Sequence, residues 1–207
     1  MFARSTTIQA APPSIDQGIA YLREDVMPAL LRMDGCVGFS ALVDRVSGRC
    51  IATSSWDSER AMRATSGAVQ AVRDEGTKAF GGTIAAVEEW EIALLHREHH
   101  ARAGTCARVT RIAFEPSTLD RALETVRTTV VPRLEAMPGF GSCSVLTDRS
   151  SGLTVGTFAF DSREALEASR TAAAEIRAGV VEQLGARVED VLELELVIAH
   201  LRVPELV

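Results

Sequence analysis

The chain has 207 residues, of which 46% are hydrophobic and 24% are charged, and its formal net charge is -6. The acidic balance and the lack of a basic run argue against nucleic acid and anionic membranes as partners. No apolar run reaches the length of a membrane span, and the N-terminus lacks the apolar core of a signal peptide, so we expect a cytoplasmic protein that binds small molecules or copies of itself.

The sequence repeats itself. Residues 1–97 align without a gap with residues 105–201, and about thirty aligned positions are identical, with the strongest match between 33–61 and 137–165. We therefore predict two domains and two connecting segments. These are repeat 1 over 1–97, a polar linker over 98–104, repeat 2 over 105–201 and a tail over 202–207.

Each repeat is expected to begin with a strand and a helix. The strand alternates apolar and polar residues, and the helix has apolar residues at three-four spacing. These patterns cover residues 3–10 and 15–33 in repeat 1 and residues 107–114 and 119–137 in repeat 2. Pro28 and Pro132 lie inside the helical pattern, where each removes a backbone donor, so we expect a kink or a break there.

A hairpin, a second helix and a last strand complete each repeat. We expect the hairpin strands of repeat 1 over residues 37–43 and 50–56, and the last strands over residues 87–96 and 191–200. Asp57 and Asp161 directly follow the hairpin and are predicted to be helix N-caps. The helix that follows has small residues on one face, which predicts either a close approach to the sheet or a cavity beneath it.

The order strand, helix, strand, strand, helix, strand is that of a ferredoxin-like α+β fold. Because one such sheet has a bare second face, we expect the two sheets to pack on each other as a barrel-like sandwich within the chain. Arg4 and Arg108 of the first strands need partners if they point into that barrel. Cross-strand partners are available among the glutamates of the last strands, Glu89, Glu91, Glu193 and Glu195.

Two stretches carry a family resemblance, DGCVGFSALVDRVSGRCIATSSWDSERAM and PGFGSCSVLTDRSSGLTVGTFAFDSREAL. They resemble the core of the antibiotic biosynthesis monooxygenase (ABM) family, which reads PGF, a strand, a DG or SG turn, and WxSxxA at the start of the second helix. The resemblance implies the dimeric α+β barrel, formed here as an intramolecular pseudo-dimer. It also implies a ligand pocket between sheet and helices in each repeat, and it leaves further homodimerisation open.

The resemblance also identifies candidate ligand-binding positions. The cofactor-free quinone-forming enzymes of this family use an Asn on the third strand, a Trp that ends it, a Tyr early in the second helix and an Arg further along. The matching positions are Ala52 and Gly156, Trp56 and Phe160, Met62 and Leu166, and Arg73 and Arg177. Only Trp56 and the two arginines keep the family's residue type.

Oxygenating a phenol without a cofactor requires its anion, and an ordinary phenol has a pKa of about 10. Arg73 and Arg177 are candidate catalytic cations that would favour the anion, and His96 and His200 are candidate catalytic bases. Trp56 would stack on a flat substrate. Each of these residues also has a structural interpretation: helix-surface pairing for the arginines, a surface position for the histidines and a core position for Trp56.

The sequence thus predicts an ABM-like protein that binds a small phenol, quinol or anthrone-like molecule. One hypothesis adds cofactor-independent monooxygenase activity, mainly in the Trp56 repeat; the alternatives are a non-catalytic ligand-binding barrel and an interaction scaffold. We expect no cofactor and no metal. The haem-ligating His of the haem-degrading branch has no counterpart, and the cysteines are not clustered.

Overall fold

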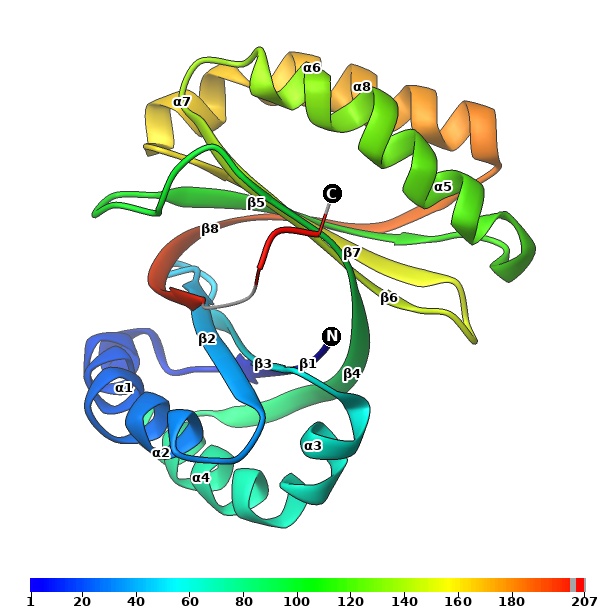
Figure 1. Cartoon of the computed structure of the whole chain (residues 1–207). Helices are drawn as coiled ribbons and strands as arrows, with labels where there is room; N and C mark the ends of the chain where they lie inside the picture. The colour runs from blue at the N-terminus through cyan, green and yellow to red at the C-terminus, as the bar shows by residue number, and fades with distance from the viewer. Residues whose placement is uncertain (202–203, 207) are drawn as a thin grey trace. The chain divides into compact units, whose positions relative to one another are not determined.

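The computed structural model describes residues 1–201 and 204–206; of the predicted tail, residues 202, 203 and 207 lie outside the described residues. The chain divides into two compact units. Unit 1 consists of Met1–Trp90 and Leu196–Val203, and unit 2 consists of Glu91–Glu195 and Pro204–Val207. Both combine helices with antiparallel strands, so the predicted α+β class is confirmed (Figure 1).

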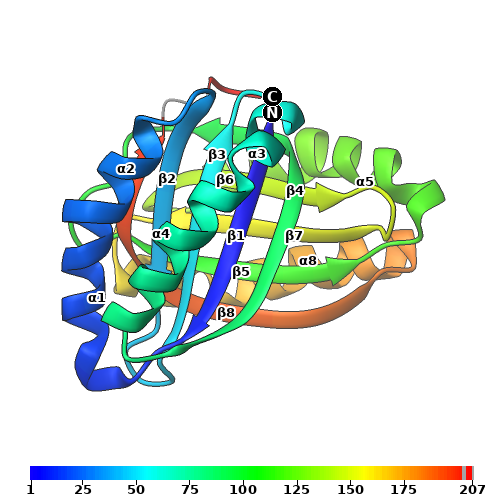
Figure 2. The ribbon, with the colours of Figure 1, turned by 90° about the horizontal axis from the view of Figure 1, so that it is seen from below.

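Unit 1 contains the first three strands of the chain, the first part of the fourth, and their helices. In chain order these are β1 (Phe2–Gln9), η1 (Pro12–Ser14), α1 (Ile15–Tyr21), η2 (Leu22–Val26), α2 (Met27–Leu31), β2 (Cys36–Val43), β3 (Arg49–Trp56), α3 (Glu59–Ala64), α4 (Ser66–Ala79) and β4 (Thr83–Arg97). Strand β3 lies between β1 and β2, and β4 follows on the other side of β1. Helices α1 to α4 lie across one face of these strands (Figure 2).

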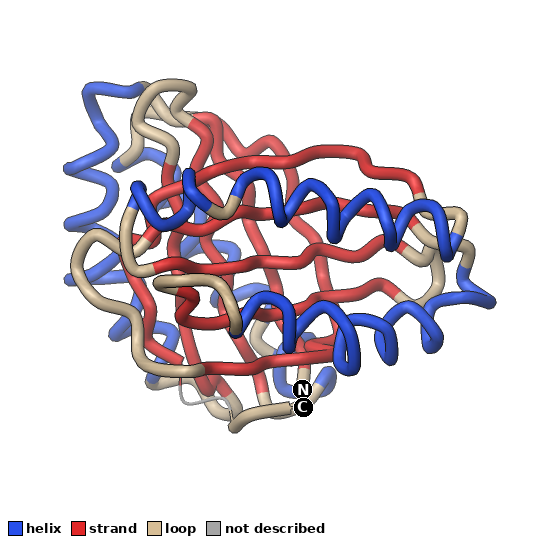
Figure 3. Tube along the Cα trace, turned by 90° about the horizontal axis from the view of Figure 1, so that it is seen from above, coloured by secondary structure: helices blue, strands red, loops and turns tan. Residues whose placement is uncertain are grey.

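Unit 2 repeats this order. Its elements are β5 (Cys106–Ala113), η3 (Pro116–Thr118), α5 (Leu119–Thr125), η4 (Val126–Val130), α6 (Val131–Glu135), β6 (Phe140–Asp148), β7 (Leu153–Phe160), α7 (Arg163–Ala168), α8 (Arg170–Leu184) and β8 (Arg187–Leu201). Strand β7 lies between β5 and β6, and β8 pairs with β5. Figure 3 shows the helices of this unit as two runs lying across its strands.

The two prolines expected to break the first helix of each repeat are accommodated by a wider helical turn. Leu22–Val26 and Val126–Val130 are π-helical, and Pro28 and Pro132 lie in the first turn of the α-helices that follow. Because the missing N–H of proline is tolerated in a first turn, the chain stays helical through both positions.

The prediction for the N-caps of the second helix is wrong by one residue. Ser58 and Ser162, rather than Asp57 and Asp161, have extended backbone and accept a hydrogen bond from the amide three residues later. An N-cap is defined by its backbone conformation as well as its side chain. Where two good capping residues are adjacent, the point at which the strand ends decides between them.

The last strands are longer than predicted and are shared between the units. Strand β4 begins at Thr83 rather than residue 87, and β8 begins at Arg187 rather than residue 191. The division between units falls after Trp90 within β4 and after Glu195 within β8. The second part of β4 pairs with β6 of unit 2, from Glu91 to Arg97. In the described part of the chain no helix is long and apolar enough to cross a membrane.

Candidate functional site

Each unit contains a cavity between its sheet and its helices. The cavity of unit 2 has a volume of about 80 Å³, and that of unit 1 about 40 Å³. Twelve of the thirteen residues that line the unit 1 cavity have their counterpart, 104 positions later, in the lining of the unit 2 cavity; Phe39 is the exception. The repeated sequence therefore forms the same pocket twice, at two different sizes.

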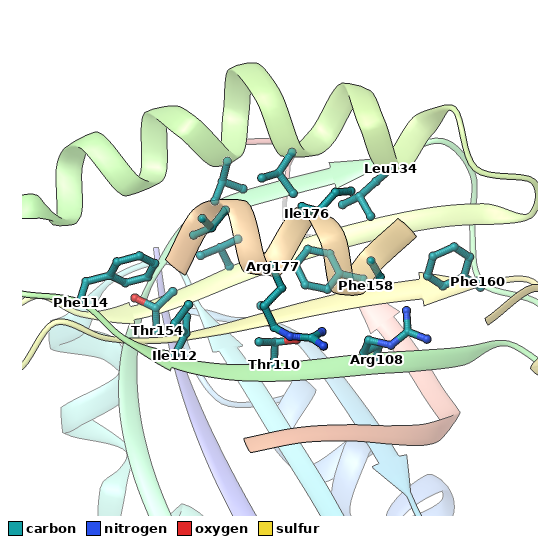
Figure 4. A pocket seen from close by; sticks show the side chains of 16 residues that line it. Arg108, Thr110, Ile112, Phe114, Leu134, Thr154, Phe158, Phe160, Ile176 and Arg177 are labelled. Carbon is teal, nitrogen blue, oxygen red and sulfur yellow. The ribbon is translucent and has the colours of Figure 1, made fainter. Parts of the chain in front are cut away.

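Strand alternation explains which residues form the floor of the unit 2 cavity. Residues two apart in a strand share a face of the sheet, and β5 pairs with β7 in the register Arg108 to Phe158 and Thr110 to Gly156. All four line the cavity. Figure 4 shows Arg108 and Thr110 on the floor strands and Phe158 on the same side.

The walls of this cavity are almost wholly apolar. Phe114 and Phe160 lie at its two ends, and Leu134 and Ile176 reach it from the helices (Figure 4). Gly156, at the position where the family's enzymes have Asn, accommodates the Phe158 ring: a Cβ added there would lie 2.8 Å from Phe158 Cζ. A flat apolar ring suits such walls, because aromatic faces and edges pack on one another.

Arg177 is the unusual group in this apolar lining. It is half-buried on α8, and its guanidinium reaches down toward Thr110 (Figure 4). Within residues 1–201 and 204–206 its side chain takes part in no hydrogen bond or ion pair. An arginine facing an apolar cavity without a carboxylate is a ready partner for an anionic ligand group.

Arg108, by contrast, has partners for both of its Nη atoms. It is 3% exposed, its Nη1 donates to Ser169 Oγ at 2.9 Å, and its Nη2 donates to Glu193 Oε1 at 2.8 Å and to the Leu166 carbonyl at 2.9 Å. Glu193 forms a second ion pair with Arg170, with 2.6 Å between Glu193 Oε2 and Arg170 Nη2. Hydrogen bonds from Arg170 first, and from Arg108, lower the pKa of Glu193 to about 2. Arg108 is thus neutralised and contributes shape more than charge.

Arg4 of unit 1 has the matching ion pair, with 2.6 Å between its Nη2 and Glu89 Oε1. The predicted cross-strand Arg–Glu pairs are therefore confirmed. Arg4 also donates to the Met62 carbonyl and to Ser66 Oγ, so the side chain points to the helices of its own unit and lines the cavity there. Glu91 pairs with Arg149 instead.

The predicted ligand-binding residues divide into two groups. Ala52, with Arg73, lines the cavity of unit 1, and Phe160, with Arg177, lines that of unit 2. Trp56 is not among the residues lining the unit 1 cavity: it is 0% exposed, and its Nε1 donates to Ser54 Oγ at 3.0 Å.

Met62 and Leu166 are likewise absent from the cavity linings among the described residues. They are 1% and 0% exposed and contribute their carbonyl oxygens to the paired arginines. These side chains therefore belong to the hydrophobic cores of their units rather than to a cavity wall.

Neither candidate base lies in a described cavity. His96, near the end of β4, has its Nε2 2.9 Å from Glu135 and 3.2 Å from Glu98, and its ring stacks on Phe140 at 6.4 Å between centroids. The ligand atoms of these three ionisable residues lie within 4.8 Å of one another, but hydrogen bonding accounts for the cluster. His200, on β8, has a buried Nε2 without a partner in the described structure.

Sequence reasoning missed the threonines and the third-strand aromatic residue of the pocket. Thr6 and Thr110 line the two cavities, and their identity between the repeats was an available signal. Ser54 and Phe158 occupy equivalent lining positions but differ in size. No alternation rule distinguishes a wall residue from a core residue before the helices are in place.

Solved structures with the same fold cover almost the whole chain. An anthrone oxidase-like protein matches with a TM-score of 0.67 at 15% identity, over 99% of this chain and 95% of its own. A ferredoxin fold protein related to antibiotic biosynthesis monooxygenases, from Listeria monocytogenes, has a TM-score of 0.53 at 9% identity, over 94% and 95%. The heme-degrading enzyme LmHde of the same species matches with a TM-score of 0.53 at 8% identity, over 94% of this chain and 99% of its own. At these identities the likeness shows the fold alone.

Sequence relatives are much closer. No family model matches the chain. "Uncharacterized protein Rv2558" of Mycobacterium tuberculosis (strain ATCC 25618 / H37Rv) is 52% identical over the whole chain, which covers 88% of that protein. "Uncharacterized protein Rv2557" of the same strain is 48% identical over the whole chain, which covers 92% of it. The chain, with its duplicated cavity, therefore belongs to the family of these two mycobacterial proteins.

Proposed function

We propose that the unit 2 cavity binds a small aromatic molecule with an acidic oxygen, of the phenol, quinol or anthrone class. The observation that carries the proposal is Arg177, a guanidinium without an ion pair in the described structure that faces an apolar cavity (Figure 4). The ring would pack against Phe158 and Phe160, and the oxygen would lie at Arg177 and Thr110.

Electrostatics determines what such a site does to its ligand. An opposite charge within a few ångströms favours the charged form of an acid, most strongly where water is excluded. A phenol with an ordinary pKa of about 10 would be bound as its anion at a lower pH. The proposed activity is therefore selective binding of the anion, not merely of an apolar ring.

The proposal takes the fold to be an intramolecular dimeric α+β barrel built from two ABM-like repeats. Two observations support it: the fold of the structural neighbours, and the division of β4 and β8 between the compact units. Exchange of the last strand is a natural way for two ferredoxin-like sheets to join.

Cofactor-independent oxygenation is the second candidate, favoured by the likeness to an anthrone oxidase-like protein. One O₂ would convert a ring methylene to a carbonyl and release one water. Among the described residues no carboxylate or imidazole lines the cavity, so solvent would have to take the proton while Arg177 stabilises the anion. Binding is therefore the primary proposal, and oxygen uptake is a separate measurement.

A matched ligand pair tests the binding proposal. The intact chain is titrated with 1-naphthol and with its O-methyl ether, and thermal shift and the long-wavelength absorption of naphtholate are recorded. We expect 1-naphthol to bind as the anion and to raise stability by about 2.7 kcal/mol at 100 times its Kd. Arg177→Met should weaken binding at least tenfold.

The equivalent substitution in unit 1, Arg73→Met, is the matched control and should leave naphthol binding unchanged. Equal binding of naphthol and its ether, or unchanged binding by Arg177→Met, would contradict the proposal. Oxygen uptake with anthrone then tests the second candidate, and a lack of uptake with intact binding would leave a ligand-binding protein.

A further inference from the structure

We infer that the cavity of unit 1 is a binding site for a small monovalent planar anion, of the class of a short carboxylate such as formate. This site is separate from the one proposed for unit 2. It rests on two arginines that face one small cavity with donors left unused.

Arg4 supplies the first unused donor. The residue is 4% exposed and lines the cavity. Its Nε and Nη2 are used by Glu89, the Met62 carbonyl and Ser66 Oγ, whereas Nη1 is buried without a hydrogen-bond partner in the described structure. Buried N–H groups rarely go without an acceptor.

Arg73 supplies the second unused donor. It lines the same cavity from α4, and its Nε is buried and also lacks a partner among the described residues. Its side chain takes part in no ion pair in the described structure. The Thr6 hydroxyl, two residues after Arg4 on β1, belongs to the same lining and makes no hydrogen bond among the described residues. The cavity is therefore lined, from the sheet and from the helix, by two arginines that each have a buried donor without a partner in the described structure.

Charge distinguishes an anion from a water molecule as the occupant. Glu89 compensates Arg4, with Arg63 a weaker second partner of that carboxylate at 3.9 Å. The positive charge of Arg73 then remains uncompensated, because none of the described lining residues is acidic. Water would satisfy the N–H groups but not the charge, whereas a carboxylate satisfies both and matches the planar guanidinium.

Size distinguishes a small anion from an aromatic one. The cavity has half the volume of its counterpart, and Phe39 contributes a ring to it that has no equivalent in the unit 2 lining. The counterpart also lacks the orphan donor, because Arg108 Nη1 donates to Ser169 Oγ. The two repeats thus keep the same arginines but present different ligand surfaces.

Titration of the intact chain with ¹³C-labelled formate, followed by NMR line broadening and thermal shift at constant ionic strength, tests the inference. We expect saturable binding that weakens at least tenfold in Arg73→Met and is unchanged in Arg177→Met. The salt that keeps the ionic strength constant is a bulky organic sulfonate, because this anion cannot enter so small a cavity.

A second variant tests the cavity without changing any charge. Ser54→Phe introduces the residue that unit 2 has at the equivalent position, and it should abolish formate binding while circular dichroism remains that of the parent. Non-saturable stabilisation shared by Arg73→Met would show a general salt effect and overturn the inference. So would formate binding that survives in a folded Ser54→Phe variant. Neither result bears on naphthol binding, which is measured at Arg177.

Discussion

At the scale of single residues, Gly18 packs directly against the ring of Phe80 in unit 1. A Cβ added to Gly18 would lie 2.3 to 2.5 Å from three ring atoms of Phe80. The equivalent pair in unit 2 is Ala122 and Leu184. Because Leu184 is smaller than Phe80, it leaves room for the methyl group of Ala122. The two repeats therefore fill the same helix-sheet space with different pairs of residues.

Gly18→Ala should destabilise the protein by about 1 to 3 kcal/mol, because overpacking outweighs the roughly 1 kcal/mol gain in helix propensity. Gly179→Ala in α8 is the matched control: no atom lies within 4 Å of its added Cβ, so the propensity gain should appear as increased stability. Urea unfolding measures both. Adding Phe80→Leu to Gly18→Ala should recover part of the lost stability. If Gly18→Ala and Gly179→Ala change stability equally, the packing argument fails.

At the scale of elements, Glu193 connects three of them in unit 2. The carboxylate on β8 accepts from Arg108 on β5 and from Arg170 at the start of α8. Because its folded pKa is about 2, below the ordinary 4.5, its contribution to stability is complete above about pH 4.5 and is lost as pH falls toward 2.

Glu193→Gln should therefore lower stability at pH 7 and reduce the loss that the parent shows between about pH 4.5 and 2. Urea unfolding at several pH values across this window measures the difference. Glu167→Gln removes a more exposed carboxylate, 3.8 Å from the same Arg170, and should keep the parent's pH dependence. A Glu193→Gln curve parallel to that of the parent would show that the carboxylate does not link the elements.

At the scale of the whole molecule, neither compact unit is encoded by one continuous repeat. Unit 1 includes residues 196–201, from the last strand of repeat 2, and unit 2 begins at Glu91, within the last strand of repeat 1. A repeat expressed alone would lose a strand segment from its unit and leave another segment unpaired.

The fragments 1–104 and 105–207, made separately, should thus not be folded monomers. We expect each either to unfold without cooperativity or to sediment as a dimer, and an equimolar mixture to regain the parent's thermal transition. The control is the full chain cut once within 98–104 after folding, which should keep that transition. A cooperative monomeric fragment 1–104 would contradict the prediction.

Much of the fold could be predicted because it depends on local periodicity. The order of strands and helices, the disturbance at Pro28 and Pro132, and the Arg–Glu pairs follow from spacing and from adjacent strands. Arg73 and Arg177 were identified by resemblance and both line cavities. The side on which Trp56 packs could not be predicted, because the sequence of its strand, RCIATSSW, has no clear alternation of apolar and polar residues.

The sequence by itself predicted an α+β unit written twice, with the same arginines in each copy. Only the tertiary structure decided which of those arginines keeps an available charge. Arg108 is neutralised by residues 58 to 85 positions away, whereas Arg177 is left facing an apolar cavity. Charge compensation and cavity volume depend on side chains that meet only after the helices pack on the sheet, so neither is expressed in local periodicity.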